Sequence, residues 1–134
     1  MPADASLLAA RLLLAFLFLV SGFSALRDMA GATGYFSSLG FPAPSFVAWA
    51  TCLFELAAGG LIVLGFGTRA TALLLAAFSV AAGFIGHYGQ GGEDATLAFM
   101  HSQALMKDVA IAGGFLALAV AGAGAWSVDA RRRR

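Results

Sequence analysis

The sequence predicts an all-α membrane protein, a transmembrane four-helix bundle with both termini in the cytoplasm. Three observations support this fold class: apolar residues make up 60% of the 134 residues, only 11% are charged, and four segments are long and apolar enough to cross a bilayer. A water-soluble domain carries about 25% charged residues. The chain therefore has too little polar material to cover a water-facing surface, and we treat residues 1–134 as one membrane domain.

The predicted spans lie at about residues 7–26, 46–66, 70–87 and 104–123. Each approaches the roughly 20 apolar residues that cross about 30 Å of hydrocarbon. The first segment has no clear cleavage site and is long enough to span, so we interpret it as a helix and not as a signal peptide. Gly65 and Gly67 form a tight turn before the third span, and Thr68 is its predicted N-cap.

The connection after the first span contains a further helical pattern. Met29, Ala32, Phe36 and Leu39 recur at intervals of three or four residues after Asp28, which is a suitable N-cap. Two interpretations remain open: a short amphipathic helix on the membrane surface, or a lid that covers the ends of the spans.

The distribution of Lys and Arg predicts the orientation. With four spans, Arg11, Arg69 and the run 131–134 lie on one side, whereas Arg27 and Lys107 lie on the other. Cytoplasmic loops carry the excess of basic residues, so both termini are predicted to be cytoplasmic. The arginine tail is also expected to attract anionic membrane lipid.

Glu55 is the most informative residue, because it lies near the middle of the second span. Insertion scales assign a charged residue at this depth a cost of about 2.5 to 3.5 kcal/mol, so such residues usually face the bundle interior and serve a function. One interpretation is a catalytic role in proton exchange. The other is an interhelical hydrogen bond that only fastens the bundle.

Several polar residues are expected at a similar height near the outer ends of the spans. Arg27 ends the first span, His87 ends the third, and Lys107 with Asp108 begins the fourth. A compact bundle would gather them, together with His101, into an outward-facing pocket with Glu55 as its floor. The alternative is ordinary interfacial charge, in which Lys107 reaches the headgroups and the histidines, His101 included, lie in water.

Cys52 shares a helical face with Glu55, three residues away. It is either a small apolar packing residue or a redox thiol. The candidate substrate-binding residues are therefore His87, Lys107, Asp108, Arg27 and Cys52, and the candidate catalytic residue is Glu55.

Other classes of function are excluded by what the sequence lacks. The two histidines do not have the additional ligands and spacing of a zinc or haem site, so no metal is predicted. There is no broad basic face with aromatic readout residues, which argues against nucleic-acid binding. A single cysteine permits no intramolecular disulfide.

The chain resembles the DoxX family of small bacterial membrane proteins over nearly its whole length. The resemblance is carried by Arg11 to Leu14 with Ser21-Gly22, Tyr35-Phe36 with Gly40-Phe41-Pro42, Glu55-Leu56 with Gly59-Gly60, Phe66 to Arg69, His87, Met106-Lys107-Asp108 with Gly113-Gly114, and Gly124 to Asp129. This chain departs from the family's usual pattern at Ala25, where Lys is frequent, and at Asp108, where Asn is common.

The resemblance implies a four-helix bundle in the bacterial cytoplasmic (inner) membrane and a link to redox metabolism. We expect an integral membrane subunit that handles a quinone, or a thiol or sulfur substrate, together with a partner oxidoreductase that supplies the electrons. Glu55 would exchange the proton, and Lys107 and His87 would bind carbonyl oxygens or an anionic sulfur substrate.

A non-catalytic alternative is a membrane scaffold that recruits soluble redox enzymes through the inner turn and the arginine tail. Transport of a small solute or proton is a weaker third interpretation of the same buried carboxylate. Pairs of small residues such as Ser21-Gly22, Gly59-Gly60 and Gly113-Gly114 offer surfaces for close helix packing and for a homo-oligomer.

Overall fold

The structure is a computed structural model that describes residues 2–132 and, within them, contains helices and no strand. In chain order the helices are α1 (Pro2–Arg27), α2 (Met29–Ser38), α3 (Pro44–Leu64), α4 (Thr68–His87), α5 (Ala95–Ala121) and α6 (Val128–Arg131). Helices α1, α3, α4 and α5 are long and apolar enough to cross a membrane. The predicted fold class is confirmed, while the side of the membrane that holds the termini remains a prediction.

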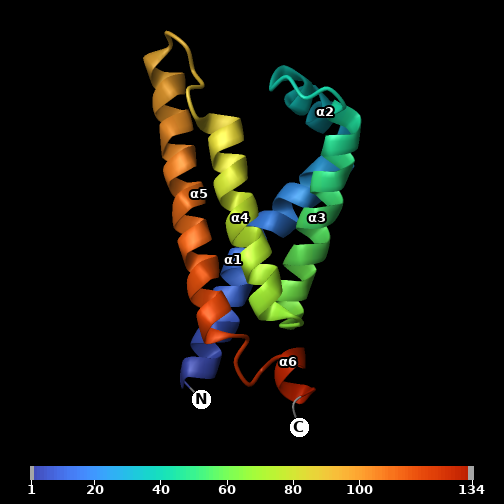
Figure 1. Ribbon diagram of the computed structural model, residues 1–134, viewed down its shortest axis with the longest axis vertical. Helices are drawn as coiled ribbons and strands as arrows, with labels where there is room; N and C mark the ends of the chain where they lie inside the picture. Colours follow the sequence, from blue (N-terminus) through green and yellow to red (C-terminus); the bar gives the residue numbers. More distant parts are fainter. Residues whose placement is uncertain (1, 133–134) are drawn as a thin grey trace.

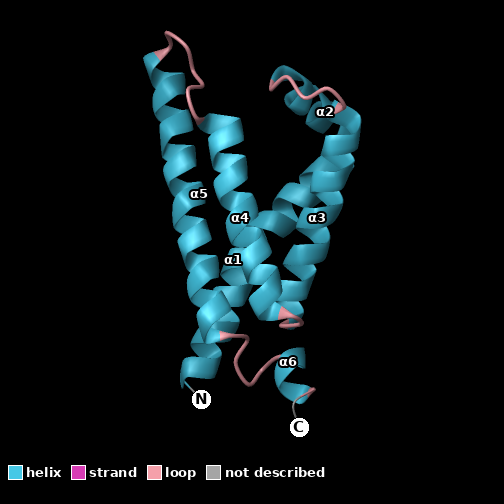
Figure 2. Cartoon of the chain, viewed as in Figure 1, coloured by secondary structure: helices cyan, strands magenta, loops and turns pink. Residues whose placement is uncertain are grey.

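The two ends of the bundle differ in what they carry. Both chain ends and the α3–α4 turn lie at one end, which we call the terminal end (Figure 1). Helix α2 and the α4–α5 loop lie at the opposite end, which we call the distal end. Loops are confined to these two ends, as Figure 2 shows.

The four long helices associate as two pairs. Helix α1 packs mainly on α3, and α4 packs mainly on α5, whereas the contacts between the pairs are fewer. The pairs lie close together toward the terminal end and diverge toward the distal end (Figure 1). The two pairs are therefore held together mainly in the half of the bundle toward the terminal end.

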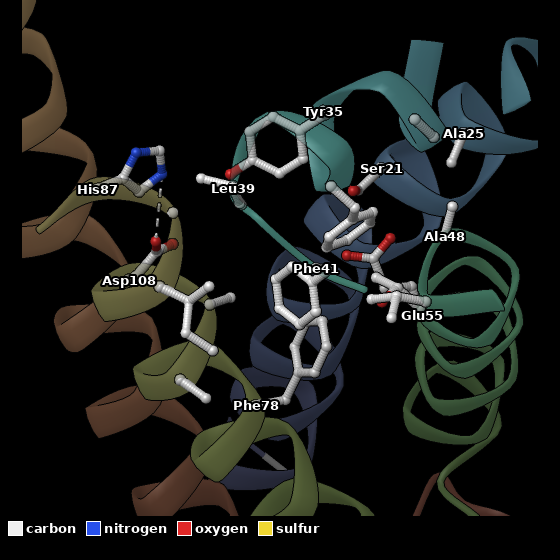
Figure 3. A pocket seen from close by; sticks show the side chains of 18 residues that line it. Ser21, Ala25, Tyr35, Leu39, Phe41, Ala48, Glu55, Phe78, His87 and Asp108 are labelled. Carbon is white, nitrogen blue, oxygen red and sulfur yellow. Dashed lines mark ion pairs between the residues drawn. The ribbon is translucent and has the colours of Figure 1, made fainter. Parts of the chain in front are cut away.

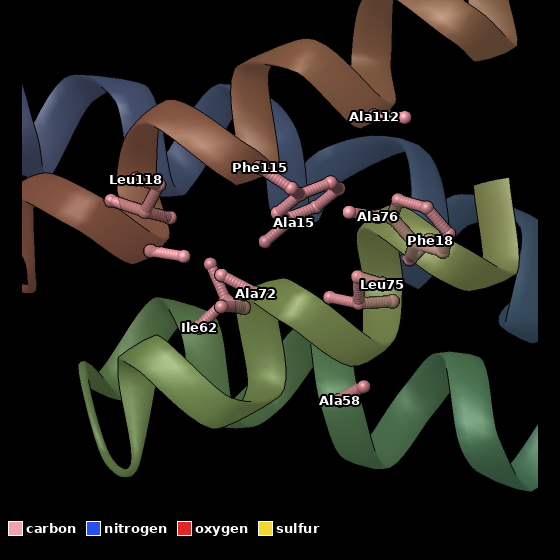
Figure 4. Close-up of a cluster of buried hydrophobic side chains, with 11 residues drawn as sticks. Ala15, Phe18, Ala58, Ile62, Ala72, Leu75, Ala76, Ala112, Phe115 and Leu118 are labelled. Carbon is pink, nitrogen blue, oxygen red and sulfur yellow. The ribbon is translucent and has the colours of Figure 1, made fainter. Parts of the chain in front are cut away.

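The apolar core joins the two pairs (Figure 4). Within it, the ring of Phe18 on α1 meets Phe78 on α4 and Phe115 on α5 edge to face, with centroids 6.0 and 5.5 Å apart. Such edge-to-face pairs are a favourable aromatic geometry. The core also contains Ala15, Ala58, Ile62, Ala72, Leu75, Ala76, Ala112, Leu118 and Ala119.

Small residues bring α1 close to α3, as their sequence pattern predicts. A Cβ atom at Gly59 would lie 3.0 Å from the side chain of Leu19, and one at Gly22 would lie 2.7 Å from Cγ of Leu56. At Gly60, by contrast, a Cβ atom would meet nothing within 4 Å. Of the Gly59-Gly60 pair, the first residue therefore forms the close contact.

The fourth span begins at Ala95, earlier than the predicted residue 104. The carboxylate of Asp94 accepts hydrogen bonds from the backbone N–H groups of Thr96 and Leu97 at 2.9 and 3.0 Å, which caps the helix there. The intervening residues include His101 and Gln103. The predicted boundary lies too late because the polar residues His101, Ser102 and Gln103 interrupt the apolar pattern, although they are helical.

The predicted N-cap of α4 is wrong. Thr68 is the first residue of the helix, and Gly67 occupies the cap position with a left-handed φ of 58°. The backbone N–H groups of Gly67 and Thr68 instead donate to the carboxylate of Asp129 at 2.8 and 2.9 Å. A carboxylate at a helix N-terminus satisfies free N–H groups and complements the helix dipole, so the cap is supplied by the last part of the chain.

The burial of Arg11 at the terminal end is not expected from the sequence. The charge pattern counts this residue among the interfacial cations, but the structure leaves only 1% of it exposed. Its Nη2 donates a hydrogen bond of 2.6 Å to the backbone oxygen of Trp126. The guanidinium lies against Gly65, where a Cβ atom would overlap Nη1. Arg11 therefore holds the segment after α5 against the α3–α4 turn.

Candidate functional site

A cavity of about 440 Å³ lies in the distal half between the helix pairs (Figure 3). Its lining comes from α1 to α5 and is mostly apolar. The lining residues are Ser21, Ala25, Ala32, Tyr35, Phe36, Leu39, Phe41, Val47, Ala48, Thr51, Glu55, Phe78, Ala81, Ala82, Ile85, Gly86, His87 and Asp108. Pockets that hold small ligands typically measure roughly 300 to 1,000 Å³ and are lined by apolar and aromatic side chains with a few polar groups.

Glu55 supplies a carboxylate to one side of this cavity. It lies on α3 and is 7% exposed, and its carboxylate points into the space beside Phe41 (Figure 3). The hydroxyl group of Ser21 on α1 interacts with it. The predicted inward orientation of Glu55 agrees with this position.

The opposite side of the cavity holds the second polar group. Nε2 of His87 on α4 lies 3.8 Å from Oδ2 of Asp108 on α5 (Figure 3). On its other side, Nδ1 of His87 lies 2.9 Å from Nδ1 of His101. The structure therefore brings together three of the predicted site residues, Glu55, His87 and Asp108, around one cavity.

The other predicted site residues lie outside the lining. Arg27 at the end of α1 and Lys107 on α5 are both exposed. Cys52 is fully buried, and its thiol donates to the backbone oxygen of Gly22 at 3.2 Å. This contact lies between α1 and α3, away from the cavity lining. The assignment of these three residues to substrate binding stays a prediction.

Helix α2 covers the distal side of the cavity, which favours the lid over a helix that rests on the membrane surface. Asp28 caps it, as the sequence predicts, by accepting a hydrogen bond from the backbone N–H of Gly31 at 2.9 Å. Phe36 and Leu39 of the periodic pattern, together with Phe41 beyond the helix, line the cavity. The apolar face of α2 is thus turned toward the cavity.

Tyr35 is the functional candidate that sequence reasoning misses. Its hydroxyl lies so close to α4 that a Cβ atom at Gly86 would be 2.5 Å from it. Partial burial, and next the negative charge of Asp108, raise the pKa of Tyr35. No sequence signal marks this contact, because Tyr35 is one position away from the periodic apolar residues of its helix.

Two features of the lining limit which ligands fit. None of the residues that line the cavity in the described part of the chain is Lys or Arg. Both positions at which the chain departs from the pattern of the family it resembles, Ala25 and Asp108, belong to the lining. The cavity therefore offers acidic, imidazole and hydroxyl groups, but no fixed cation for an anionic substrate.

Within residues 2–132, no three His, Cys, Asp or Glu side chains are grouped so that they could hold a metal ion.

The comparisons with known proteins agree with the fold. A family model described as DoxX matches residues 6–88. The inner membrane protein YqjF of Escherichia coli K12 is 35% identical over 128 residues, which cover 94% of this chain and 91% of the relative. The inner membrane protein YphA of the same organism is 39% identical over 126 residues, which cover 93% and 89% of the two chains. No solved structure matches the chain.

Proposed function

Since this chain belongs to the DoxX family and is an integral inner membrane protein, we propose that it is the quinone-binding subunit of a membrane redox system. The observation that carries this proposal is one apolar cavity with polar groups on two opposite sides: Glu55 on one, His87 with Asp108 on the other. A quinone ring is apolar in its body and carries a carbonyl oxygen at each of two opposite positions. The polarity of the cavity is complementary to that pattern.

The aromatic lining fits the ring. Phe41 and Phe78 lie between Glu55 and the His87–Asp108 pair in Figure 3. Aromatic side chains pack on flat rings in offset or edge-to-face arrangements. Ile85 lines the cavity and is 50% exposed. A quinone's isoprenoid tail would leave along this side.

The lack of Lys or Arg in the described lining favours a quinone over an anionic sulfur substrate. A buried anion needs a paired charge or several hydrogen-bond donors. Arg27 and Lys107, the cations closest in sequence to the site residues, are exposed outside the lining. A neutral quinone needs only donors to its two carbonyl oxygens.

The chain's own residues would supply protons. Reduction of a quinone to a quinol consumes two electrons and two protons, and a partner oxidoreductase carrying a flavin would supply the electrons. Glu55 would donate one proton at the carbonyl nearest to it and recover it from water. A positioned carboxyl group is suited to this general-acid role.

A membrane scaffold is the second candidate, and one observation favours it. The inner turn and the start of the arginine tail form a continuous surface, because Asp129 binds the turn and the guanidinium of Arg132 lies 5.1 Å from the ring centroid of Phe66. Residues 133 and 134 of the tail lie outside the described residues. Deleting residues 131–134 should abolish recovery of soluble partner enzymes if this surface docks them.

The quinone proposal is tested by equilibrium dialysis of a short-chain ubiquinone against the detergent-purified protein. Replacing Glu55 by Leu removes one hydrogen bond to a carbonyl oxygen, which is worth about 1 kcal/mol, so the Kd should rise about fivefold. Glu93→Gln is the matched control, because Glu93 is an exposed carboxylate in the α4–α5 loop. Equal affinity of the wild type and Glu55→Leu would remove Glu55 from the site, and an absence of binding to the wild type would overturn the proposal.

A further inference from the structure

His87 and His101 are joined by a hydrogen bond at the distal edge of the cavity. Their Nδ1 atoms are 2.9 Å apart, and the ring centroids are 5.2 Å apart. Two imidazole nitrogens approach so closely only when one carries the hydrogen and the other accepts it. The tautomer of one ring therefore fixes the tautomer of the other.

The contact extends into a row of three residues. When Nδ1 of His87 accepts from His101, the hydrogen of a neutral His87 is on Nε2, the atom that faces Asp108 at 3.8 Å. His87 and Asp108 line the cavity, whereas His101 does not. His101 precedes Asp108 on α5 by two helical turns, about 10 Å toward the distal end. The row thus leads from the distal end to the wall of the cavity.

We propose that His101, His87 and Asp108 form a proton relay between water at the distal end and the cavity. The inference rests on the proposed quinone site, to which it adds the path of the protons. The amino-acid sequence leaves open whether His101 belongs to the outward-facing pocket or lies in water, and the structure joins it to a residue of the cavity wall.

Each step of the relay moves one proton and no electron. Water protonates Nε2 of His101, which then releases its Nδ1 proton to Nδ1 of His87. His87 releases its Nε2 proton to Oδ2 of Asp108, so that one O–H bond forms on the carboxylate for each N–H bond broken on the ring. Asp108 passes the proton to a quinone oxygen that has gained electrons. Each ring then returns to its first tautomer by releasing a proton from one nitrogen to water and taking up a proton from water on the other.

The separation of 3.8 Å between His87 and Asp108 is longer than a direct hydrogen bond. One bridging water or a small ring rotation spans such a gap, and catalytic contacts often tighten when ligand binds. Two further titratable groups, Tyr35 on α2 and Glu55 on α3, line the same cavity as His87 and Asp108. Tyr35 lies near Asp108, and Glu55 lies on the opposite side of the cavity.

The relay is tested by the rate at which the protein takes up protons after a bound quinone is reduced. Detergent-purified protein is loaded with a short-chain ubiquinone and reduced by a radiolytic pulse, and a pH-indicator dye reports proton uptake. His101→Asn keeps a hydrogen-bonding group near the position of Nδ1, but it cannot exchange protons. Uptake in this variant should slow by roughly 100-fold, the lower end of the effect of a positioned acid–base group.

Two further measurements separate a relay from a structural role. Free imidazole in the buffer should restore the uptake rate of His101→Asn, which a merely structural histidine would not allow. The matched control is Ser102→Ala, an exposed neighbour on α5 that should leave the rate unchanged. The Kd for the quinone should be the same in all three proteins, because His101 does not line the cavity.

The outcomes are distinct. Unchanged uptake in His101→Asn, with normal quinone binding, overturns the relay and leaves the quinone site intact. Slow uptake that imidazole does not restore also overturns the relay. A wild-type protein that binds no quinone overturns the proposed function and the relay with it.

Discussion

Asp129 caps a helix that begins sixty-one residues earlier: its Oδ2 accepts a hydrogen bond of 2.9 Å from the backbone N–H of Thr68. Oδ1 accepts a second from Gly67 at 2.8 Å, and the backbone N–H of Asp129 donates to the oxygen of Gly65 at 2.9 Å. The three bonds tie the segment after α5 to the α3–α4 turn. The terminal end is thereby closed, in contrast to the distal end, where the helix pairs diverge.

Replacing Asp129 by Ala should lower the free energy of unfolding by about 1 to 2 kcal/mol, the cost of losing a helix N-cap. The measurement is the midpoint of thermal unfolding in detergent, followed by size-exclusion chromatography. Asp129→Asn should lower the free energy of unfolding by less, because its amide oxygen still accepts one of the two hydrogen bonds. A midpoint for Asp129→Ala equal to that of the wild type would show that the capping contact contributes nothing.

Gly65 and Gly67 provide a matched pair in the same turn. Both have positive φ, of 66° and 58°, so Ala at either position costs roughly 1 to 2 kcal/mol in backbone energy. Only at Gly65 would the new Cβ also overlap Arg11, since at Gly67 it would meet nothing nearer than Thr71 Oγ1 at 3.9 Å. Gly65→Ala should therefore unfold at a clearly lower temperature than Gly67→Ala. Equal midpoints of thermal unfolding for Gly65→Ala and Gly67→Ala would contradict the buried position of Arg11.

Gly22→Ala should destabilise the contact between α1 and α3. The new Cβ would lie 2.7 Å from Cγ of Leu56 and 3.3 Å from the backbone oxygen of Cys52, so the Leu56 side chain or one of the two helices must shift. Gly113→Ala in α5 is the control, because its Cβ would meet nothing within 4 Å and Ala favours a helix over Gly by about 1 kcal/mol. Thermal unfolding should place Gly22→Ala below the wild type and Gly113→Ala at or above it. The reverse order would show that the two helices do not approach at Gly22.

Glu55→Leu separates the two interpretations of the buried carboxylate. If Glu55 serves a function, Glu55→Leu should raise the free energy of unfolding by up to about 3 kcal/mol, because a carboxylate at mid-membrane is costly. The same substitution should weaken quinone binding. If Glu55 only fastens the bundle to Ser21, the substitution should lower stability and leave binding unchanged. Thermal unfolding and dialysis of the same preparation decide between these results.

The raised pKa of Tyr35 predicts a loss of stability in alkali. The neutral phenol is favoured in the folded protein, so the stabilisation is fully present below its ordinary pKa of 10.0 and is lost as the pH rises through the folded-state value. The free energy of unfolding should therefore fall above pH 10.0, and fall less in Tyr35→Phe. The difference between the ultraviolet titrations of the wild type and Tyr35→Phe reports the ionisation of the Tyr35 phenol. Asp108→Asn should lower the pKa of Tyr35, and no change would contradict their proximity.

The amino-acid sequence by itself determined the fold class, the four spans, the helix after Asp28 and the inward position of Glu55. These properties follow from local composition, because a long apolar segment must form a helix in lipid and a central carboxylate must avoid the lipid. Short motifs along the chain likewise indicated the resemblance to the DoxX family, and the match of the family model to residues 6–88 confirms it.

Only the tertiary structure decided which polar residues meet. Lys107 and Asp108 are neighbours in sequence, but only Asp108 lines the cavity, because adjacent residues on a helix point about 100° apart. The burial of Arg11, the capping of Thr68 by Asp129, and the pairing of His87 with His101 all join separate elements. Such contacts depend on how helices rotate and cross. Local periodicity identifies the faces of each helix, but it does not specify which side chains of one helix lie opposite those of the next.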